Sequence, residues 1–136
     1  MQKAFVDTSI IIRLLVKDSE QKYKDVVKLL SGARGQGIAL YLLPVAILET
    51  VIVLEKVYKL NKNSVAERIA ALMNTPDIII ELESVFLKAV KSYVESNVKF
   101  ADAVMGYWGL DKGIADVFTY DEKDFLRIEG LNVHKP

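Results

Sequence analysis

Short apolar runs separated by helical stretches are the feature of this sequence that most restricts its fold. The first run, residues 4–6, ends at the carboxylate of Asp7, and an apolar pattern with helical spacing resumes directly after Thr8 and Ser9. Four further runs of this kind lie at residues 38–43, 77–82, 114–119 and 131–133. Strands that alternate with helices form mostly parallel sheets with helices on both faces. The sequence therefore predicts an α/β fold with a mostly parallel sheet of four to five strands.

The helical patterns between these runs carry recognisable start signals. They cover residues 8–17, 18–34, 45–58, 64–73, 84–97, 100–111 and 121–127. Thr8 or Ser9 is the expected N-cap of the first helix, because a hydroxyl can accept a hydrogen bond from a free backbone N–H there. Pro44 suits the first turn of the third helix. Asn63 or Ser64 is the expected N-cap of the fourth.

Length and composition indicate one domain over residues 1–136, large enough to bury a hydrophobic core. Apolar residues make up 51% of the chain, which leaves room for a buried interface between subunits. No apolar stretch approaches the roughly 18 residues that a membrane span needs. The first three residues lead straight into a strand and leave no room for a signal peptide. We therefore expect a cytoplasmic protein without a membrane partner.

Charge and cysteine content exclude some classes of function. Eighteen basic and eighteen acidic residues cancel, so no overall positive field attracts nucleic acid. A polyanion would have to be bound by a local patch or through a metal ion. The chain has no cysteine, which excludes disulfides and thiolate metal sites. The only histidine, His134, lies at an end expected to fray and is not expected to be a ligand.

Four acids stand apart from the others by their context. Asp7 and Asp121 follow the ends of strands, whereas Glu49 and Asp102 lie in early turns of helices. In a parallel sheet all four can lie at one edge. Carboxylates clustered without histidine or cysteine favour a hard cation, Mg²⁺ or Mn²⁺. Such a site suits the hydrolysis of phosphate esters.

Two of these acids also have simpler interpretations. Glu49 interrupts a helix that is apolar on nearly all sides, so it is either paired with a cation or turned out to water. Asp102 lies in the first turn of its helix, where a carboxylate is favoured by the helix dipole. Both interpretations stay open at this point.

Four stretches occur in the order and spacing of PIN domains, and the chain most resembles the VapC-type toxin ribonucleases of prokaryotic toxin-antitoxin systems. They are residues 6–11, 44–49, 100–104 and 117–125. The resemblance covers essentially the whole length. It implies a PIN-like three-layer sandwich, with the sheet between layers of helices.

The resemblance also implies roles for the acids. Asp7, Glu49, Asp102 and Asp121 would form the catalytic site and bind one or two Mg²⁺ or Mn²⁺ ions. Asp124 matches an acidic position of the family's last motif and could share the fourth ligand role with Asp121. Supporting hydroxyls that orient carboxylates or water would come from Thr8, Ser9 and Thr119.

The implied reaction is cleavage of single-stranded RNA by a metal-activated water, which leaves a 5′-phosphate and a 3′-hydroxyl. The candidates for contacts with the RNA backbone are Arg13, Lys17, Lys99 and Lys123. Each is equally well explained as a solvated basic residue on a helix face. The family resemblance and the apolar content both point to a homodimer, and a cognate antitoxin would be the protein partner.

The main alternatives are another Mg²⁺-dependent phosphohydrolase or nuclease and a catalytically inactive PIN-like interaction module. A haloacid-dehalogenase-like phosphatase needs a second Asp two residues after the strand-end Asp, and that position is Ser9. Metal-dependent turnover separates an enzyme from an interaction module. One departure from the family is the bulky pair Tyr107 and Trp108, at positions where many relatives carry small residues. This pair is more typical of a core or dimer contact than of a base-stacking platform.

Overall fold

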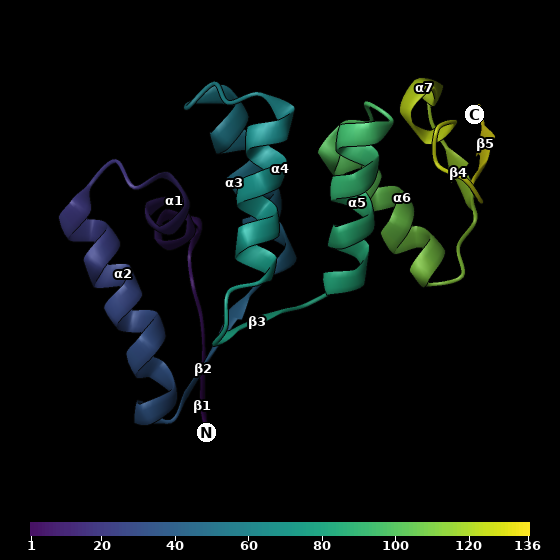
Figure 1. Cartoon of the computed structure of the whole chain (residues 1–136). Coiled ribbons are helices and arrows are strands. Elements are labelled where there is room, and N and C mark those ends of the chain that lie inside the picture. Colours follow the sequence, from purple (N-terminus) through teal and green to yellow (C-terminus); the bar gives the residue numbers. More distant parts are fainter. The chain divides into compact units, whose positions relative to one another are not determined.

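The computed structural model describes all of residues 1–136 and divides them into two compact units (Figure 1). Unit 1 is Met1–Glu81, and unit 2 is Leu82–Pro136. The single domain expected over the whole chain stays a prediction. None of the helices is both long enough and apolar enough to span a membrane.

Unit 1 contains a three-stranded parallel sheet (Figure 1). Its strands, in spatial order, are β1 (Gln2–Phe5), β2 (Ile38–Leu42) and β3 (Ile78–Ile80). Ala4 pairs with Leu40 of the central strand, which pairs in turn with Ile78. Because the strands are parallel, their carboxyl ends lie at one edge of the sheet, and the segment carrying Asp7 leaves from that edge.

Five helical segments complete unit 1. They are α1 (Thr8–Val16), α2 (Glu20–Ala33), the 3₁₀ turn η1 (Arg34–Gln36), α3 (Pro44–Lys56) and α4 (Lys62–Met73). Helix α1 packs on α2 and α3, and α3 packs on α4. The side chains of Ile11, Leu42, Ile47, Leu54 and Ile69 are fully buried. Burial of these side chains is the main source of stability for the unit.

Unit 2 pairs three helices with a two-stranded parallel sheet. The elements are α5 (Glu83–Glu95), α6 (Phe100–Asp111), β4 (Asp116–Phe118), α7 (Glu122–Phe125) and β5 (Asn132–His134). The core contact between α5 and α6 is aromatic: Phe100 stacks on Phe86 with ring centroids 6.2 Å apart and meets Tyr93 edge-on at 5.8 Å. Tyr107 and Trp108 are half-buried in α6.

The predicted α/β class and the parallel pairing are confirmed, with seven α-helices and five strands. The five strands, however, form sheets of three and two strands instead of one. The expected N-caps were wrong by one to three residues. Asp7 caps α1, and Asn61 caps α4 by accepting a hydrogen bond from Ser64 N–H at 2.9 Å. Both cap residues have extended backbone, which lets a short side chain turn back to the first helical N–H groups.

Pro44 and His134 were also given expected places in the fold. Pro44 occupies the first turn of α3, as predicted. His134 was expected at a frayed end but belongs to β5, where its ring stacks on Phe118 at 5.1 Å and Nε2 lies 2.8 Å from Oδ1 of Asp116. These contacts and the pairing with β4 hold this end of the chain.

Candidate active site

Asp7 lies between the end of β1 and the start of α1, and its side chain is fixed by the residue two positions later. Its Oδ2 accepts hydrogen bonds from the Ser9 N–H at 3.1 Å and from the Ser9 hydroxyl at 2.6 Å. These bonds, the hydroxyl bond first, hold the pKa of Asp7 below its usual value of 3.8, because they stabilise the charged form. Asp7 is therefore an exposed carboxylate in a fixed orientation.

The other residues of unit 1 proposed for the site differ in exposure. Thr8 is buried in the first turn of α1, with 8% of its surface exposed. Glu49 lies in the second turn of α3 and is exposed, as in the interpretation that turns it out to water. Its neighbours along the helix, Ile47 and Thr50, are fully buried, so α3 keeps Glu49 on the side away from its packed face.

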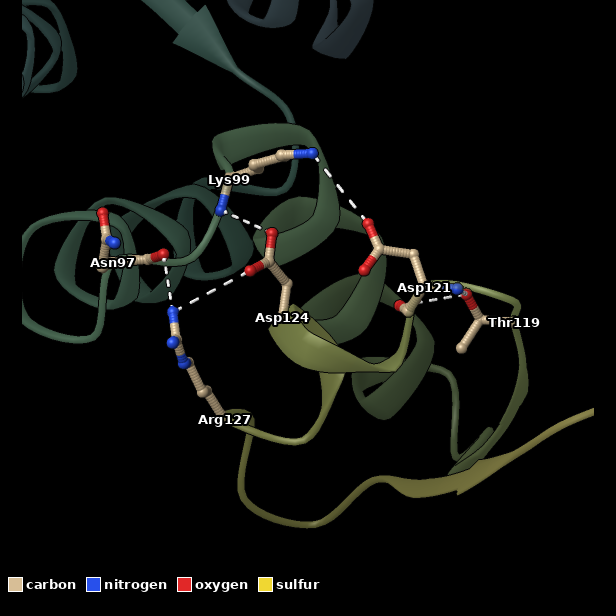
Figure 2. A network of polar contacts seen from close by, with 6 residues as sticks. All are labelled: Asn97, Lys99, Thr119, Asp121, Asp124 and Arg127. Carbon is tan, nitrogen blue, oxygen red and sulfur yellow. Dashed lines mark hydrogen bonds and ion pairs between the residues drawn. The ribbon is translucent and has the colours of Figure 1, made fainter.

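Three carboxylates of unit 2 come from two elements that pack on each other. Asp102 lies in the first turn of α6, Asp121 is the N-cap of α7, and Asp124 lies within α7. Figure 2 shows both acids next to Lys99, with Asp124 at its backbone N–H and Asp121 toward the end of its side chain. The contact between α6 and α7 brings together acids that are about twenty residues apart in the sequence.

Asp124 is the most tightly bound of these acids. Its side chain is only 7% exposed, and its Oδ2 accepts a hydrogen bond from the backbone N–H of Lys99 at 3.1 Å. The other oxygen, Oδ1, lies 4.0 Å from Nη1 of Arg127. The same Nη1 donates to the backbone carbonyl of Asn97 at 3.1 Å (Figure 2). It also lies 3.4 Å from the carbonyl of Ser96. A buried carboxylate needs partners of this kind to offset its desolvation.

Asp121 is held by its backbone and leaves its carboxylate open. Its N–H donates to the Thr119 hydroxyl at 2.9 Å, and that hydroxyl lies 3.1 Å from the Asp121 carbonyl oxygen. The carboxylate is 65% exposed, and the nearest cation is Nζ of Lys99 at 3.9 Å (Figure 2). Thr119 thus fixes the turn that carries Asp121, whereas the carboxylate faces water.

Burial and the neighbouring carboxylates raise the pKa of Asp102. Partial burial is the largest cause, followed by a hydrogen bond with Asp124 and the negative charge of Asp124. Asp121 adds to the effect, and the charge of Lys99 only partly opposes it. An acid among acids holds its proton to a higher pH because a second negative charge is unfavourable there. The negative charge around Asp102 is therefore incompletely compensated by the protein.

The ligand atoms that these acids offer are of the kind that a hard divalent cation prefers. Asp102 and Asp121 offer carboxylate oxygens, with neither sulfur nor imidazole beside them, and uncompensated negative charge favours a cation at Asp102. No group of three or more His, Cys, Asp or Glu side chains is arranged to hold a metal ion as the structure stands. Asp7 and Glu49 belong to unit 1, and the expected cluster of four acids stays a prediction.

The candidate RNA-binding residues have unequal surroundings. Arg13 forms an ion pair with Asp18 at 2.9 Å, and Nζ of Lys17 lies 4.9 Å from the centre of the Tyr23 ring. Lys99 and Lys123 are both exposed and lie in the elements that carry the acids of unit 2. Beside Asp7, a groove of about 300 Å³ is lined by Ser9, Ile10, Arg13, Lys22, Asp25 and Val26. Polar and charged groups from α1 and α2 therefore face this groove.

Comparison with known proteins bears on this site. The family model of the PIN domain matches residues 4–131. The chain belongs to the PIN domain family. A search of curated proteins finds no match. PIN domains are generally metal-dependent nucleases that act on nucleic acid, so the chain has a nuclease-type fold and, at this coarse level, a hydrolase character.

Sequence reasoning missed one residue of this PIN domain, Arg127. It lies three residues after Asp124 and was not distinguished from other surface cations. A basic residue at that spacing beside an acid in a helical pattern is a weak signal for an ion pair. The contacts with the carbonyls of Ser96 and Asn97, about thirty residues away, could not be inferred from the sequence.

Proposed function

We propose that this PIN domain is a metal-dependent endoribonuclease that cleaves single-stranded RNA and is the toxin of a VapBC-type toxin-antitoxin pair. The observation that carries the proposal is the meeting of Asp102 with Asp124 and Asp121, where the pKa of Asp102 is raised. Enzymes that neutralise phosphate charge through a metal need such an excess of carboxylates. Membership of the PIN family supplies the class of reaction.

In this proposal Asp7, Glu49, Asp102 and Asp121 hold one or two Mg²⁺ or Mn²⁺ ions. When bound, the metal supplies an activated water and neutralises negative charge on the phosphate. Hydrolysis would consume one water and break the bond from phosphorus to the 3′ oxygen. The departing oxygen takes a proton, which leaves a 3′-hydroxyl, and the phosphate stays on the 5′ side of the next nucleotide.

The protein's own residues then have distinct tasks. The Ser9 hydroxyl fixes the oxygen of Asp7 that it bonds and so orients the carboxylate. Thr119 fixes the turn of Asp121. Lys99, whose Nζ lies 3.9 Å from Oδ2 of Asp121, would contact a phosphate oxygen near the acids. Lys123, Arg13 and Lys17 are proposed as weaker contacts with the RNA backbone.

The remaining parts of the proposal concern assembly. We expect one domain over residues 1–136, a homodimer, a cognate antitoxin that covers the acids, and a cytoplasmic location. Their support is the likeness of the four sequence motifs to VapC-type toxins, together with the apolar content of 51%. An antitoxin that places an Arg at the acids would compensate the charge that raises the pKa of Asp102.

The deciding experiment incubates end-labelled RNA and the matching DNA with purified protein in Mg²⁺, in Mn²⁺ or in EDTA. We expect cleavage of RNA only, dependent on metal, with products whose 5′-phosphates make them substrates for a ligase. Asp7→Asn should abolish cleavage, whereas the matched variant Asp111→Asn, at the exposed end of α6, should retain it.

Other outcomes would replace the proposal. Cleavage of DNA, or release of phosphate from a monoester, would indicate a different Mg²⁺-dependent phosphohydrolase. Absence of both cleavage and metal binding by calorimetry would indicate a catalytically inactive PIN-like interaction module. Metal binding without cleavage of the RNAs tested would indicate an enzyme that is highly specific for the sequence of its RNA.

A further inference from the structure

Asp121 and Asp124 are the two candidates for the acidic position of the family's last motif, and their surroundings differ sharply. Asp121 has an open, exposed carboxylate, and Asp124 has a buried one with a partner at each oxygen. A residue that binds a metal needs free lone pairs on its oxygens. This difference raises the question of which acid would hold the ion.

The bond from Lys99 to Asp124 bears directly on Asp102. Lys99 is the N-cap of α6, and Asp102 stands three residues later, the position from which an acid can accept the N-cap N–H in a capping box. Here the Lys99 N–H donates to Oδ2 of Asp124 instead. Because Asp124 takes this donor, the Asp102 carboxylate is not used to cap its own helix, and its side-chain hydrogen bond is made with Asp124 instead.

Arg127 ties Asp124 into place from the other side. Its Nη1 lies 4.0 Å from Oδ1 of Asp124 and contacts the carbonyl of Asn97 (Figure 2). It also contacts the carbonyl of Ser96, at the end of α5. One guanidinium thus joins α7 to the loop that leads into α6. That loop ends at Lys99, so the two contacts of Asp124 act on the same short segment.

We propose that Asp124 and Arg127 are positioning residues that fix α7 against the first turn of α6 and do not themselves bind the metal. This assignment rests on the proposed function. Asp124 works through the Lys99 N–H, and Arg127 works through Asp124 and the loop carbonyls. Residues that orient metal ligands in this way typically change metal affinity or activity by about 10–100-fold when they are replaced.

The test measures Mn²⁺ binding in the absence of RNA, from the loss of the free Mn²⁺ signal in electron paramagnetic resonance, together with thermal melting in EDTA. Asp121→Asn should weaken Mn²⁺ binding by at least about tenfold and leave the melting temperature unchanged or higher. Asp124→Asn should keep the Mn²⁺ affinity within about threefold, because an amide oxygen still accepts the Lys99 N–H. Its melting temperature should fall, because the pair with Arg127 is lost.

Arg127 is tested by two substitutions and a matched control. Arg127→Met should weaken Mn²⁺ binding about tenfold, and Arg127→Lys should recover part of the loss, because an ammonium can still donate to a carbonyl. Arg34→Met removes another Arg–Asp ion pair, 3.1 Å from Asp77 in unit 1, and should leave Mn²⁺ binding unchanged. A merely structural role for Arg127 would lower the melting temperature without this change in affinity.

Two results would overturn the assignment, and they are distinguishable. If wild type binds Mn²⁺ and cleaves RNA, but Asp124→Asn loses Mn²⁺ as fully as Asp121→Asn, then Asp124 is itself a ligand and the proposed function stands. If wild type neither binds Mn²⁺ nor cleaves RNA, the proposed function and this assignment fall together.

Discussion

Ser9 donates two hydrogen bonds to one oxygen of Asp7, from its N–H at 3.1 Å and from its hydroxyl at 2.6 Å. Both favour the ionised carboxylate, and the pKa of Asp7 lies below 3.8 as a result. We predict that Ser9→Ala raises the pKa of Asp7 towards 3.8, because the hydroxyl donor is lost and the N–H remains. Carboxyl ¹³C NMR of the metal-free protein during a pH titration measures this shift.

The stability of the same variant should change with pH in a defined direction. Because the pKa of Asp7 is lower in the folded than in the unfolded protein, ionised Asp7 stabilises the fold at pH values above its unfolded pKa. This contribution is lost as the pH falls through its folded pKa. Wild type should therefore melt above Ser9→Ala at neutral pH, and the difference should vanish in acid. Ser9→Thr keeps the hydroxyl and serves as the control. An Asp7 pKa that is the same in Ser9→Ala as in wild type would contradict the assigned cause.

Asp102 should show the opposite dependence on pH. Burial and Asp124 raise the pKa of Asp102 in the folded protein above 3.8. The stability linked to this shift is therefore present at pH values below the unfolded pKa, where Asp102 is protonated, and is lost as the pH rises through the folded pKa. We predict that Asp102→Asn in EDTA melts at or above the temperature of wild type at pH 7. The gain should be no more than about 1 kcal/mol, because solvent screens this partly exposed group.

The control for this prediction is Asp111→Asn, an exposed acid at the far end of the same helix. Melting curves from pH 3 to pH 8 should show the difference between Asp102→Asn and wild type growing as the pH rises. A lower melting temperature for Asp102→Asn at every pH would mean that the Asp102 carboxylate stabilises the fold, contrary to its raised pKa.

Much of the fold could be predicted because apolar periodicity in this chain is strong. Helix α6 has the predicted bounds, and α3 begins at Pro44, where the missing N–H is no loss. Strand ends and helix caps were less predictable, because several adjacent residues are suitable by type and the backbone conformation decides among them. Asp7, Thr8 and Ser9 can all cap a helix by residue type, and only the extended backbone of Asp7, with φ −78° and ψ 158°, decides between them.

The candidate site could be predicted as a set of residues but not as a set of contacts. Asp102, Asp121 and Asp124 were chosen from their motifs, yet the sequence does not say which of the last two is buried. The Lys99 N–H, 25 residues away, donates to Asp124, and Arg127 joins Asp124 to carbonyls about thirty residues away. Contacts between distant segments follow from packing, which no local pattern encodes.

The packing of α6 against the end of unit 2 depends on Gly106. A Cβ built at Gly106 would lie 2.6 Å from Cδ1 of Ile128 and 3.2 Å from Cδ1 of Leu131. Ile128 is buried and has little room to move, so we predict that Gly106→Ala destabilises the protein by about 1–3 kcal/mol. Urea unfolding followed by circular dichroism measures this change.

Gly35→Ala is the matched control, because a Cβ there meets nothing within 4 Å. It should be neutral or stabilising by up to about 1 kcal/mol, since alanine restricts the unfolded chain more than glycine does. Equal effects of the two substitutions would show that the contact between Gly106 and Ile128 is not tight in solution.

Asp7 combines two tasks, and two substitutions separate them. As the N-cap of α1, its side chain accepts the Ser9 N–H, and asparagine performs this task about as well as aspartate. We therefore predict that Asp7→Asn keeps the melting temperature of wild type in EDTA but abolishes metal-dependent cleavage of RNA. Asp7→Ala should lose both, because a methyl group accepts no hydrogen bond. If the melting temperature fell equally in both variants, the charge of Asp7, and not its hydrogen bond as the N-cap of α1, would be what stabilises the fold.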